Sequence, residues 1–176
     1  DTNKAVIITA AHTTDIKEVP VPELGPTDVL VKVAYVGVCK TDLEVYEGTL
    51  GYYRDGLASY PITPGHEFSG TIAHIGTSVR GDQLGVGQKV VGECVLSRGE
   101  DGERKEVGVL NHNGAYSTYV VIPMDHVRPV PDTTDLKVAA LAEPLSVSLR
   151  ALRRIAHRIT AQSRILVIGA VAIGNL

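Results

Sequence analysis

The chain has 176 residues, of which 44% are hydrophobic, 21% charged and 5% aromatic, and its formal net charge is −3. This length can bury the core of one domain and part of a second. The mild charge, the scattered basic residues and the few aromatic residues argue against nucleic-acid binding and favour a small-molecule partner. Two cysteines are too few for a disulfide framework, and no apolar run has the length of a membrane span. We therefore expect a cytoplasmic protein that contacts neither nucleic acid nor membrane.

Short β-branched runs separated by glycine and proline fill the first two thirds of the chain, a pattern typical of strands joined by turns. In chain order, the expected strands are residues 4–9, 16–20, 29–38, 68–75, 89–91, 115–122 and 127–130. Thr41–Glu47 fits a short helix, whose first turn either Thr41 or Asp42 could cap. The glycine- and tyrosine-rich segment Gly48–Pro64 is typical of a loop that covers a site. Together these features predict a mainly β, barrel-like domain with short helices.

The pattern changes after Pro131. Asp135–Ala142 and Leu145–Ile159 fit helices, and the apolar residues of the second fall on one stripe. Ile165–Ile168 is a wholly apolar run that fits a buried strand, and it leads into the glycine-bounded segment Gly169–Gly174. This order predicts the opening of a nucleotide-binding strand-turn-helix unit.

Four residues supply the ligand types that zinc prefers: Cys39, His66, Glu67 and Glu143. They come from separated segments, each at the boundary of an expected element. Such wide spacing argues against a zinc finger and favours a catalytic site with an open coordination position. Gly70 stands where a metalloprotease helix would carry its second histidine, so hydrolysis by that route is not expected. Taken singly, a buried cysteine or histidine is more often inert, and the joint pattern is what indicates a metal.

Two motifs resemble a known family. The segment Gly65–Gly76 follows the pattern Gly-His-Glu-x2-Gly-x5-Gly, and Gly37–Asp42 is similar to the segment that carries the first zinc ligand in the same family. These are motifs of the zinc-containing alcohol dehydrogenases of the medium-chain dehydrogenase superfamily, and the resemblance runs from about Lys4 to the end of the chain. It implies a GroES-like, partly open β-barrel catalytic domain over residues 1–160, including a linking helix. Residues 161–176 would then be the truncated start of an α/β Rossmann domain.

The segment Ala142–Val147 resembles the glutamate version of the third ligand segment, as in sorbitol, glucose and related polyol dehydrogenases. The resemblance implies an oxidoreductase that transfers hydride between a polyol, sugar or other secondary alcohol and NAD or NADP. It leaves open whether Glu67 or Glu143 is the direct zinc ligand.

The resemblance also implies roles around the metal. Thr41 would take the proton of the substrate hydroxyl, and Asp42 would orient His66. Glu44 occupies the position at which many relatives have a relay histidine and could pass the proton onward. An exposed helix glutamate without a role in catalysis is the alternative for Glu44.

For cofactor and substrate, the resemblance points to Lys40 at the pyrophosphate, to Gly169 and Gly174 of the nucleotide-binding turn, and to Tyr46 in the substrate pocket. An ordinary surface lysine and a tyrosine that only packs under the loop are the alternatives. The turn departs from the dinucleotide fingerprint because Val171 replaces its second glycine, and its side chain would crowd the pyrophosphate. We therefore expect this chain alone to hold NAD(P) weakly.

Other departures from the family shape the expectations. The lobe that often holds a structural zinc through four cysteines contains only Cys94, so we expect one catalytic zinc and no structural zinc. The chain starts at Asp1 and stops at Leu176 within the nucleotide-binding motif, which fits a catalytic-domain fragment that is inactive alone. By resemblance, the full-length parent would be a homodimer or homotetramer.

Two other functions fit the expected fold. A zinc-free enzyme of the quinone-reductase type shares it, but Cys39, His66 and Glu67 argue against that reading. A GroES-like module that only binds or assembles with a partner predicts no metal, and it gives no reason for Thr41 and Asp42 to accompany Cys39.

Overall fold

The computed structural model describes residues 2–79, 84–98, 103–169 and 171–176. Its strands are β1 Thr2–Ala10, β2 Thr13–Pro20, β3 Asp28–Val36, β4 Phe68–Ile75, β5 Lys89–Gly92, β6 Val95–Arg98, β7 Arg104–Val107, β8 Asn111–His112, β9 Tyr119–Pro123 and β10 Val127–Pro129. Its helices are α1 Lys40–Glu47, α2 Gly51–Arg54, α3 Leu136–Ala139, α4 Ala142–Ile155 and α5 Ala172–Asn175, with 3-10 turns η1 Met124–His126 and η2 Ala156–Arg158. None of the helices in these ranges is long and apolar enough to cross a lipid bilayer.

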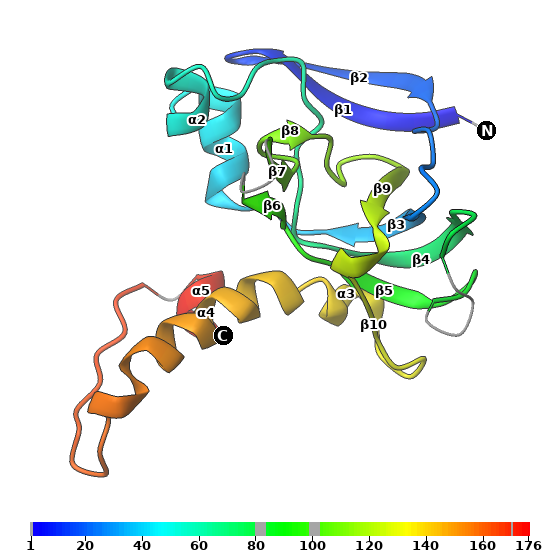
Figure 1. Cartoon of the computed structure of the whole chain (residues 1–176). Coiled ribbons are helices and arrows are strands. Elements are labelled where there is room, and N and C mark those ends of the chain that lie inside the picture. The colour runs from blue at the N-terminus through cyan, green and yellow to red at the C-terminus, as the bar shows by residue number, and fades with distance from the viewer. Residues whose placement is uncertain (1, 80–83, 99–102, 170) are drawn as a thin grey trace.

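A five-stranded antiparallel sheet in the order β10-β5-β4-β3-β9 forms the centre of the molecule. The β1–β2 hairpin lies above it (Figure 1) and is joined to the rest by isolated bridges, Ala5 with Ser117 and Ile8 with Ile62. A small sheet in the order β6-β7-β8 fills the space beside α1. Because these bridges are isolated and form no continuous ladder of hydrogen bonds, the barrel is closed only in part. The predicted mainly β domain with short helices is confirmed.

The main core lies on the inner face of the five-stranded sheet. Phe68 is its largest fully buried side chain, and apolar residues from β3, β5 and β9 pack around it. Gly92 makes room for the ring, because a Cβ at that position would lie 2.3 Å from the Phe68 Cζ atom. The core therefore fixes the start of β4, the strand that directly follows the histidine-glutamate pair.

The expected strand over residues 115–122 is wrong in its first half, since β9 begins only at Tyr119. Residues 114–116 instead hydrogen-bond to the loop before β4: the Gly114 and Ala115 amides donate to the carbonyls of Thr63 and Gly65. A strand within a sheet and an extended segment that bonds to a loop both direct every second side chain to one side. The alternating sequence pattern therefore cannot distinguish them.

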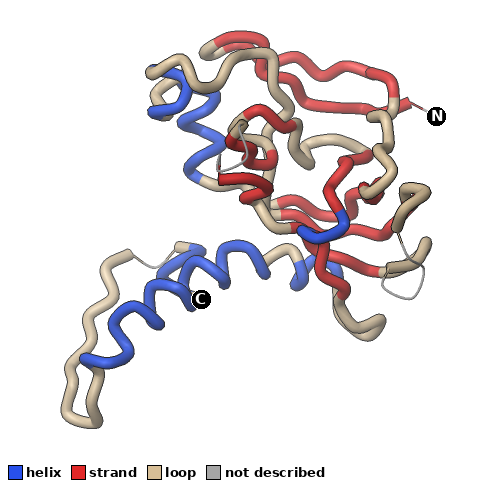
Figure 2. Tube along the Cα trace, viewed as in Figure 1, coloured by secondary structure: helices blue, strands red, loops and turns tan. Residues whose placement is uncertain are grey.

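The C-terminal segment leaves the β domain. Helix α4 projects from it, and the described residues after β10 form only helices and loops (Figures 1 and 2). The predicted apolar stripe of this helix is exposed; its members are Leu145, Leu149, Leu152, Ile155 and, beyond the helix, Ile159. The expected strand Ile165–Ile168 is wrong: the segment is an exposed loop, because the described residues hold no neighbouring strand with which it could pair. The division into domains at residue 160 stays a prediction.

Adding a methyl group at Gly70 tests the packing of β3 on β4. A Cβ there would lie 2.3 Å from the Lys32 carbonyl oxygen and 2.7 Å from a Val31 methyl group. We expect Gly70→Ala to lower the free energy of unfolding by about 1 to 3 kcal/mol, the usual cost of overpacking. Gly85→Ala is the matched control, because nothing lies within 4 Å of its Cβ position. Urea unfolding of both variants is the measurement, and an equal effect would contradict this account.

Candidate metal centre

The ends of β3 and β4 bring two of the predicted motifs together. The Gly37 amide donates to the Glu67 carbonyl at 2.7 Å, which continues the β3–β4 pairing just beyond both strands. A Cβ at Gly37 would lie 2.3 Å from the Glu67 Oε2 atom, so glycine allows the two segments to approach closely. This backbone hydrogen bond holds the two segments together just beyond the strand ends, where the Cys39, His66 and Glu67 side chains lie.

Three predicted ligands form one cluster. One donor atom from each of Cys39, His66 and Glu67 lies within 4.8 Å of the others, and this is the only such group among the described residues. His66 and Glu67 are buried, and Cys39 is partly exposed. The thiol, imidazole and carboxylate therefore converge with one side open.

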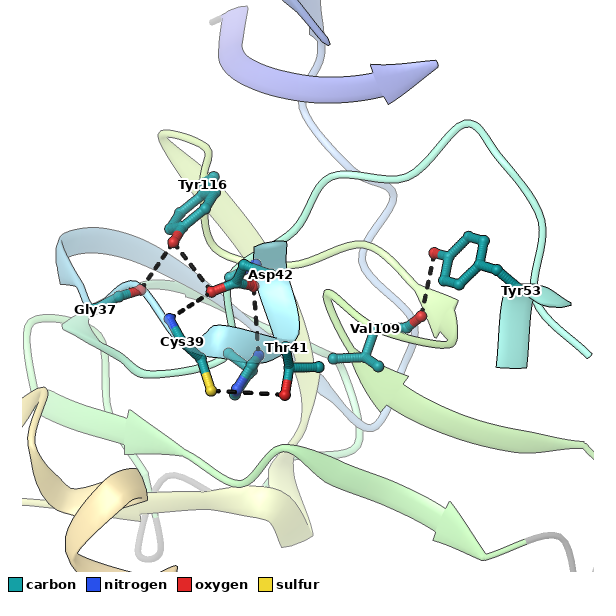
Figure 3. Close-up of polar contacts among 9 residues, drawn as sticks. Gly37, Cys39, Thr41, Asp42, Tyr53, Val109 and Tyr116 are labelled. Atoms are coloured by element: carbon teal, nitrogen blue, oxygen red, sulfur yellow. Dashed lines mark hydrogen bonds and ion pairs between the residues drawn. The ribbon is translucent and has the colours of Figure 1, made fainter. Parts of the chain in front are cut away.

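The carboxylate of Asp42 joins the segments that carry these ligands (Figure 3). Its Oδ2 atom accepts the Cys39 amide at 2.8 Å, and its Oδ1 atom accepts the Gly65 amide at 3.1 Å. Cys39 is the N-cap of α1, so neither Thr41 nor Asp42 occupies the cap position, but Asp42, the third residue of the helix, caps the first turn by accepting the Cys39 amide in a capping box.

His66 carries an unpaired nitrogen. Its Nδ1 atom is buried and has no hydrogen-bond partner, although it lies 3.7 Å from the Asp42 Oδ1 atom. That distance allows electrostatic attraction but exceeds hydrogen-bond length. Buried polar atoms are rarely left unpaired, and the charged group beside this one is the Asp42 carboxylate.

Electrostatics favour an ionic pair at the cluster. A hydrogen bond from His66 lowers the pKa of Cys39 against the opposing effect of burial. Burial lowers the pKa of His66, but contacts with Cys39, Asp42 and Glu143 outweigh it and raise the pKa to about 8. The cysteine is therefore held toward the thiolate, the form that binds metals.

Of the residues expected to assist catalysis, only Thr41 lies at the cluster besides Asp42. Its Oγ1 atom is 3.6 Å from the Cys39 sulfur. Lys40 is exposed on the first turn of α1, and Glu44 is partly exposed on the same helix. Tyr46 points to the β1–β2 turn, where its hydroxyl donates to the His12 carbonyl at 3.2 Å. Among described residues, Tyr46 does not line the cavity beside the cluster.

Glu143 lies at that cavity, which has a volume of about 750 Å³. Its wall comes from β5, β6, β10 and the start of α4, and its polar members include Glu93, Cys94, His126, Arg128, Glu143 and Ser146. Burial raises the pKa of Glu143, and the charges of His66 and Glu67 also act on it. Burial and the charge of Glu143 raise the pKa of Cys94 to about 12, so this thiol stays neutral. Glu143 is close to the three-residue cluster without being part of it.

The glycines expected to bind cofactor lie in the C-terminal segment and are not among the residues that line this cavity. Gly169 has a φ of +97°, and a Cβ at Gly174 would lie 1.9 Å from the Gly169 carbonyl oxygen. Both positions of this tight turn therefore require glycine. Ala170, between them, lies outside the described residues.

The structure adds one residue at the cluster that the sequence did not indicate. The Tyr116 hydroxyl lies 3.1 Å from the Asp42 Oδ2 atom and 3.0 Å from the Gly37 carbonyl oxygen (Figure 3). Alternation placed Tyr116 within an ordinary strand, and no local pattern links it to a helix 74 residues earlier. A contact of this kind becomes visible only when the fold is known.

Comparison with known proteins agrees with these features. A family model described as the alcohol dehydrogenase GroES-like domain matches residues 25–132. The chain is 37% identical over 140 residues to L-threonine 3-dehydrogenase of Mesorhizobium japonicum, a match that covers 74% of the chain and 40% of that protein. The chain thus spans about 40% of the length of such relatives.

Two solved structures share its fold. Galactitol-1-phosphate dehydrogenase from Escherichia coli has a TM-score of 0.81 and 26% identity, covering 97% of the chain and 50% of that protein. Acetophenone reductase from Geotrichum candidum, in complex with NAD, has a TM-score of 0.83 and 25% identity, covering 98% and 52%.

Removing the thiol tests the ionic pair in the metal-free protein. Cys39 makes the largest contribution that raises the pKa of His66, while burial lowers it. We therefore expect Cys39→Ala to move the His66 pKa from about 8 to a lower value, measured by NMR titration of the ring protons. Cys94→Ala should leave the titration unchanged. An unaltered midpoint in Cys39→Ala would show that the two side chains do not interact.

Proposed function

This chain belongs to the alcohol dehydrogenase family with a GroES-like domain, and we propose that it provides the catalytic metal centre of a zinc-dependent oxidoreductase. The reaction proposed is hydride transfer between a secondary alcohol, such as a polyol or sugar, and NAD or NADP. The convergence of Cys39, His66 and Glu67 is the observation that carries this proposal.

The residues at the cluster fit zinc. Thiolate, imidazole and carboxylate are its ordinary protein ligands, and three of them leave a fourth position for substrate. The unpaired Nδ1 atom of His66 faces Asp42, which leaves Nε2 for the metal. A metal-binding histidine usually directs its other nitrogen at a carboxylate, as this arrangement does. Glu67 is the third ligand that we favour, with Glu143 as a neighbour at the cavity wall.

Bound zinc would supply a positive charge that stabilises an alkoxide and so lowers the pKa of a substrate alcohol. Thr41 is suited to relay the hydroxyl proton, accepting it while its own hydroxyl proton passes outward to solvent, because its Oγ1 atom lies beside the Cys39 sulfur and the residue is partly exposed. Asp42 keeps the Cys39 and Gly65 segments in register during this transfer.

The cavity beside Glu143 is our candidate for the substrate pocket, in place of the surface at Tyr46. Ser146 and Glu143 offer a hydroxyl and a carboxyl group to substrate hydroxyls. Arg128 and His126 hold Glu93 at 2.7 and 3.2 Å, which keeps charged groups at the rim. A polar wall of this kind favours a polyol or another hydroxylated alcohol.

Three further proposals rest on resemblance or on the sequence. We propose NAD(P) contacts at Lys40, Gly169 and Gly174, and proton relay at Glu44. Assembly as a homodimer or homotetramer is proposed from the family alone. A cytoplasmic location is proposed from the two unpaired cysteines, Cys39 and Cys94.

Metal content tests the centre directly. After chelation and zinc repletion, we expect about one equivalent of zinc per chain by elemental analysis. Cys39→Ala removes a ligand and should weaken zinc binding by at least about 100-fold. Cys94→Ala, the matched cysteine control, should retain the metal, because Cys94 lies outside the cluster. A repleted wild-type chain without zinc would overturn the proposed function.

The pH dependence of zinc affinity follows from His66, whose pKa is about 8. Below that pH the metal must displace a proton from the ring, so the Kd should rise about tenfold per unit as pH falls from 8 to 6. Above about pH 8 the ring of His66 is already neutral, so the Kd for zinc should no longer change with pH through this group. Competition with a chelator, corrected for the protonation of the chelator, measures the slope, and a Kd independent of pH would contradict the assignment of His66 as a ligand.

A further inference from the structure

The Tyr116 hydroxyl lies where three chain segments meet. It is 3.0 Å from the Gly37 carbonyl oxygen and 3.1 Å from the Asp42 Oδ2 atom. Gly37 is bonded to Glu67, and Asp42 accepts the amides of Cys39 and Gly65. One phenol group therefore touches the supports of all three residues in the metal cluster.

The ring of Tyr116 is aimed there by its backbone. The Tyr116 amide donates to the Pro64 carbonyl at 2.9 Å, and its carbonyl accepts the Val6 amide at 2.8 Å. Gly65, with a φ of +96°, leaves the space that the ring occupies, because a Cβ there would lie 2.7 Å from the Tyr116 Cδ1 atom. The backbone hydrogen bonds and the space beside Gly65 together fix the direction of the Tyr116 side chain.

The hydroxyl acts as a donor at this position. A carboxylate and a carbonyl oxygen can only accept hydrogen bonds, so the phenol must supply the proton to either one. The carboxylate is the stronger acceptor because it is charged. Burial and the nearby charges of Asp42, Glu67 and Cys39 raise the pKa of Tyr116, which keeps the proton on the hydroxyl.

We propose that Tyr116 is a positioning residue of the metal centre: its hydroxyl holds the Asp42 carboxylate in the orientation that joins the Cys39 segment to the His66 segment. The claim about metal affinity rests on the proposed function, whereas the claim about Asp42 concerns the protein without metal. Tyr116 contacts none of the metal-binding atoms and acts through Asp42.

Tyr116→Phe removes the hydroxyl and keeps the ring against Gly65. Tyr53→Phe is the matched control, because its hydroxyl also donates to a carbonyl oxygen, that of Val109 at 3.2 Å, away from the cluster (Figure 3). We expect the Kd for Zn²⁺ to rise about tenfold in Tyr116→Phe and to stay unchanged in Tyr53→Phe. Substitution with Co²⁺ should show an altered thiolate-to-metal absorption band in Tyr116→Phe only.

Amide hydrogen exchange in the metal-free protein tests the same contact without any metal. If the hydroxyl holds Asp42, the Cys39 and Gly65 amides should exchange about fivefold faster in Tyr116→Phe, the effect of about one lost hydrogen bond. In Tyr53→Phe their rates should match those of the wild type. Unchanged rates for both amides in Tyr116→Phe would overturn the proposal.

The two hypotheses fail separately. A wild type that binds no zinc would refute the metal centre, while the exchange rates would still decide the role of Tyr116. Equal Zn²⁺ affinities of wild type and Tyr116→Phe, in a protein that does bind zinc, would refute the effect of Tyr116 on the centre and leave the centre itself intact.

Discussion

The buried carboxylate of Asp42 is the constraint on which the metal cluster depends. Only 5% of this residue is exposed, and an ionised group at such a depth is stable only when several donors surround it. The donors are the Cys39 amide, the Gly65 amide and the Tyr116 hydroxyl, which belong to three separate parts of the chain. Satisfying one charge therefore fixes three segments relative to one another, and two of them carry or adjoin the side chains of the Cys39, His66 and Glu67 cluster.

The sheet supplies the rigidity that this arrangement needs. Pairing of β3 with β4 brings Gly37 against Glu67, and the packing of Phe68 anchors the first residue of β4 in the core. The Cys39, His66 and Glu67 side chains lie one to three residues outside the ends of β3 and β4. A site held at strand ends by packing and by hydrogen bonds keeps its geometry before any ligand arrives, which lowers the cost of ordering it on binding.

Local patterns predicted most of the strands, because β-branched runs bounded by glycine and proline report on the backbone itself. They also singled out Cys39, His66 and Glu67 by residue type, and the structure brings these three side chains together. Contacts between distant segments were beyond reach: Tyr116 at Asp42 was not foreseen. The strand expected over residues 165–168 was wrong for a related reason, since a strand requires a partner and an apolar run alone does not provide one.

That exposed run has a consequence for how the chain behaves in concentrated solution. Ile165, Leu166, Val167 and Ile168 are 62%, 83%, 61% and 91% exposed, and none of them carries a charge or a proline ring that would block backbone pairing. Extended, uncharged and β-branched segments are the templates on which polypeptides add strands from other molecules. The same residues that would make a good inner strand thus leave apolar side chains and unpaired backbone open to a strand of another molecule.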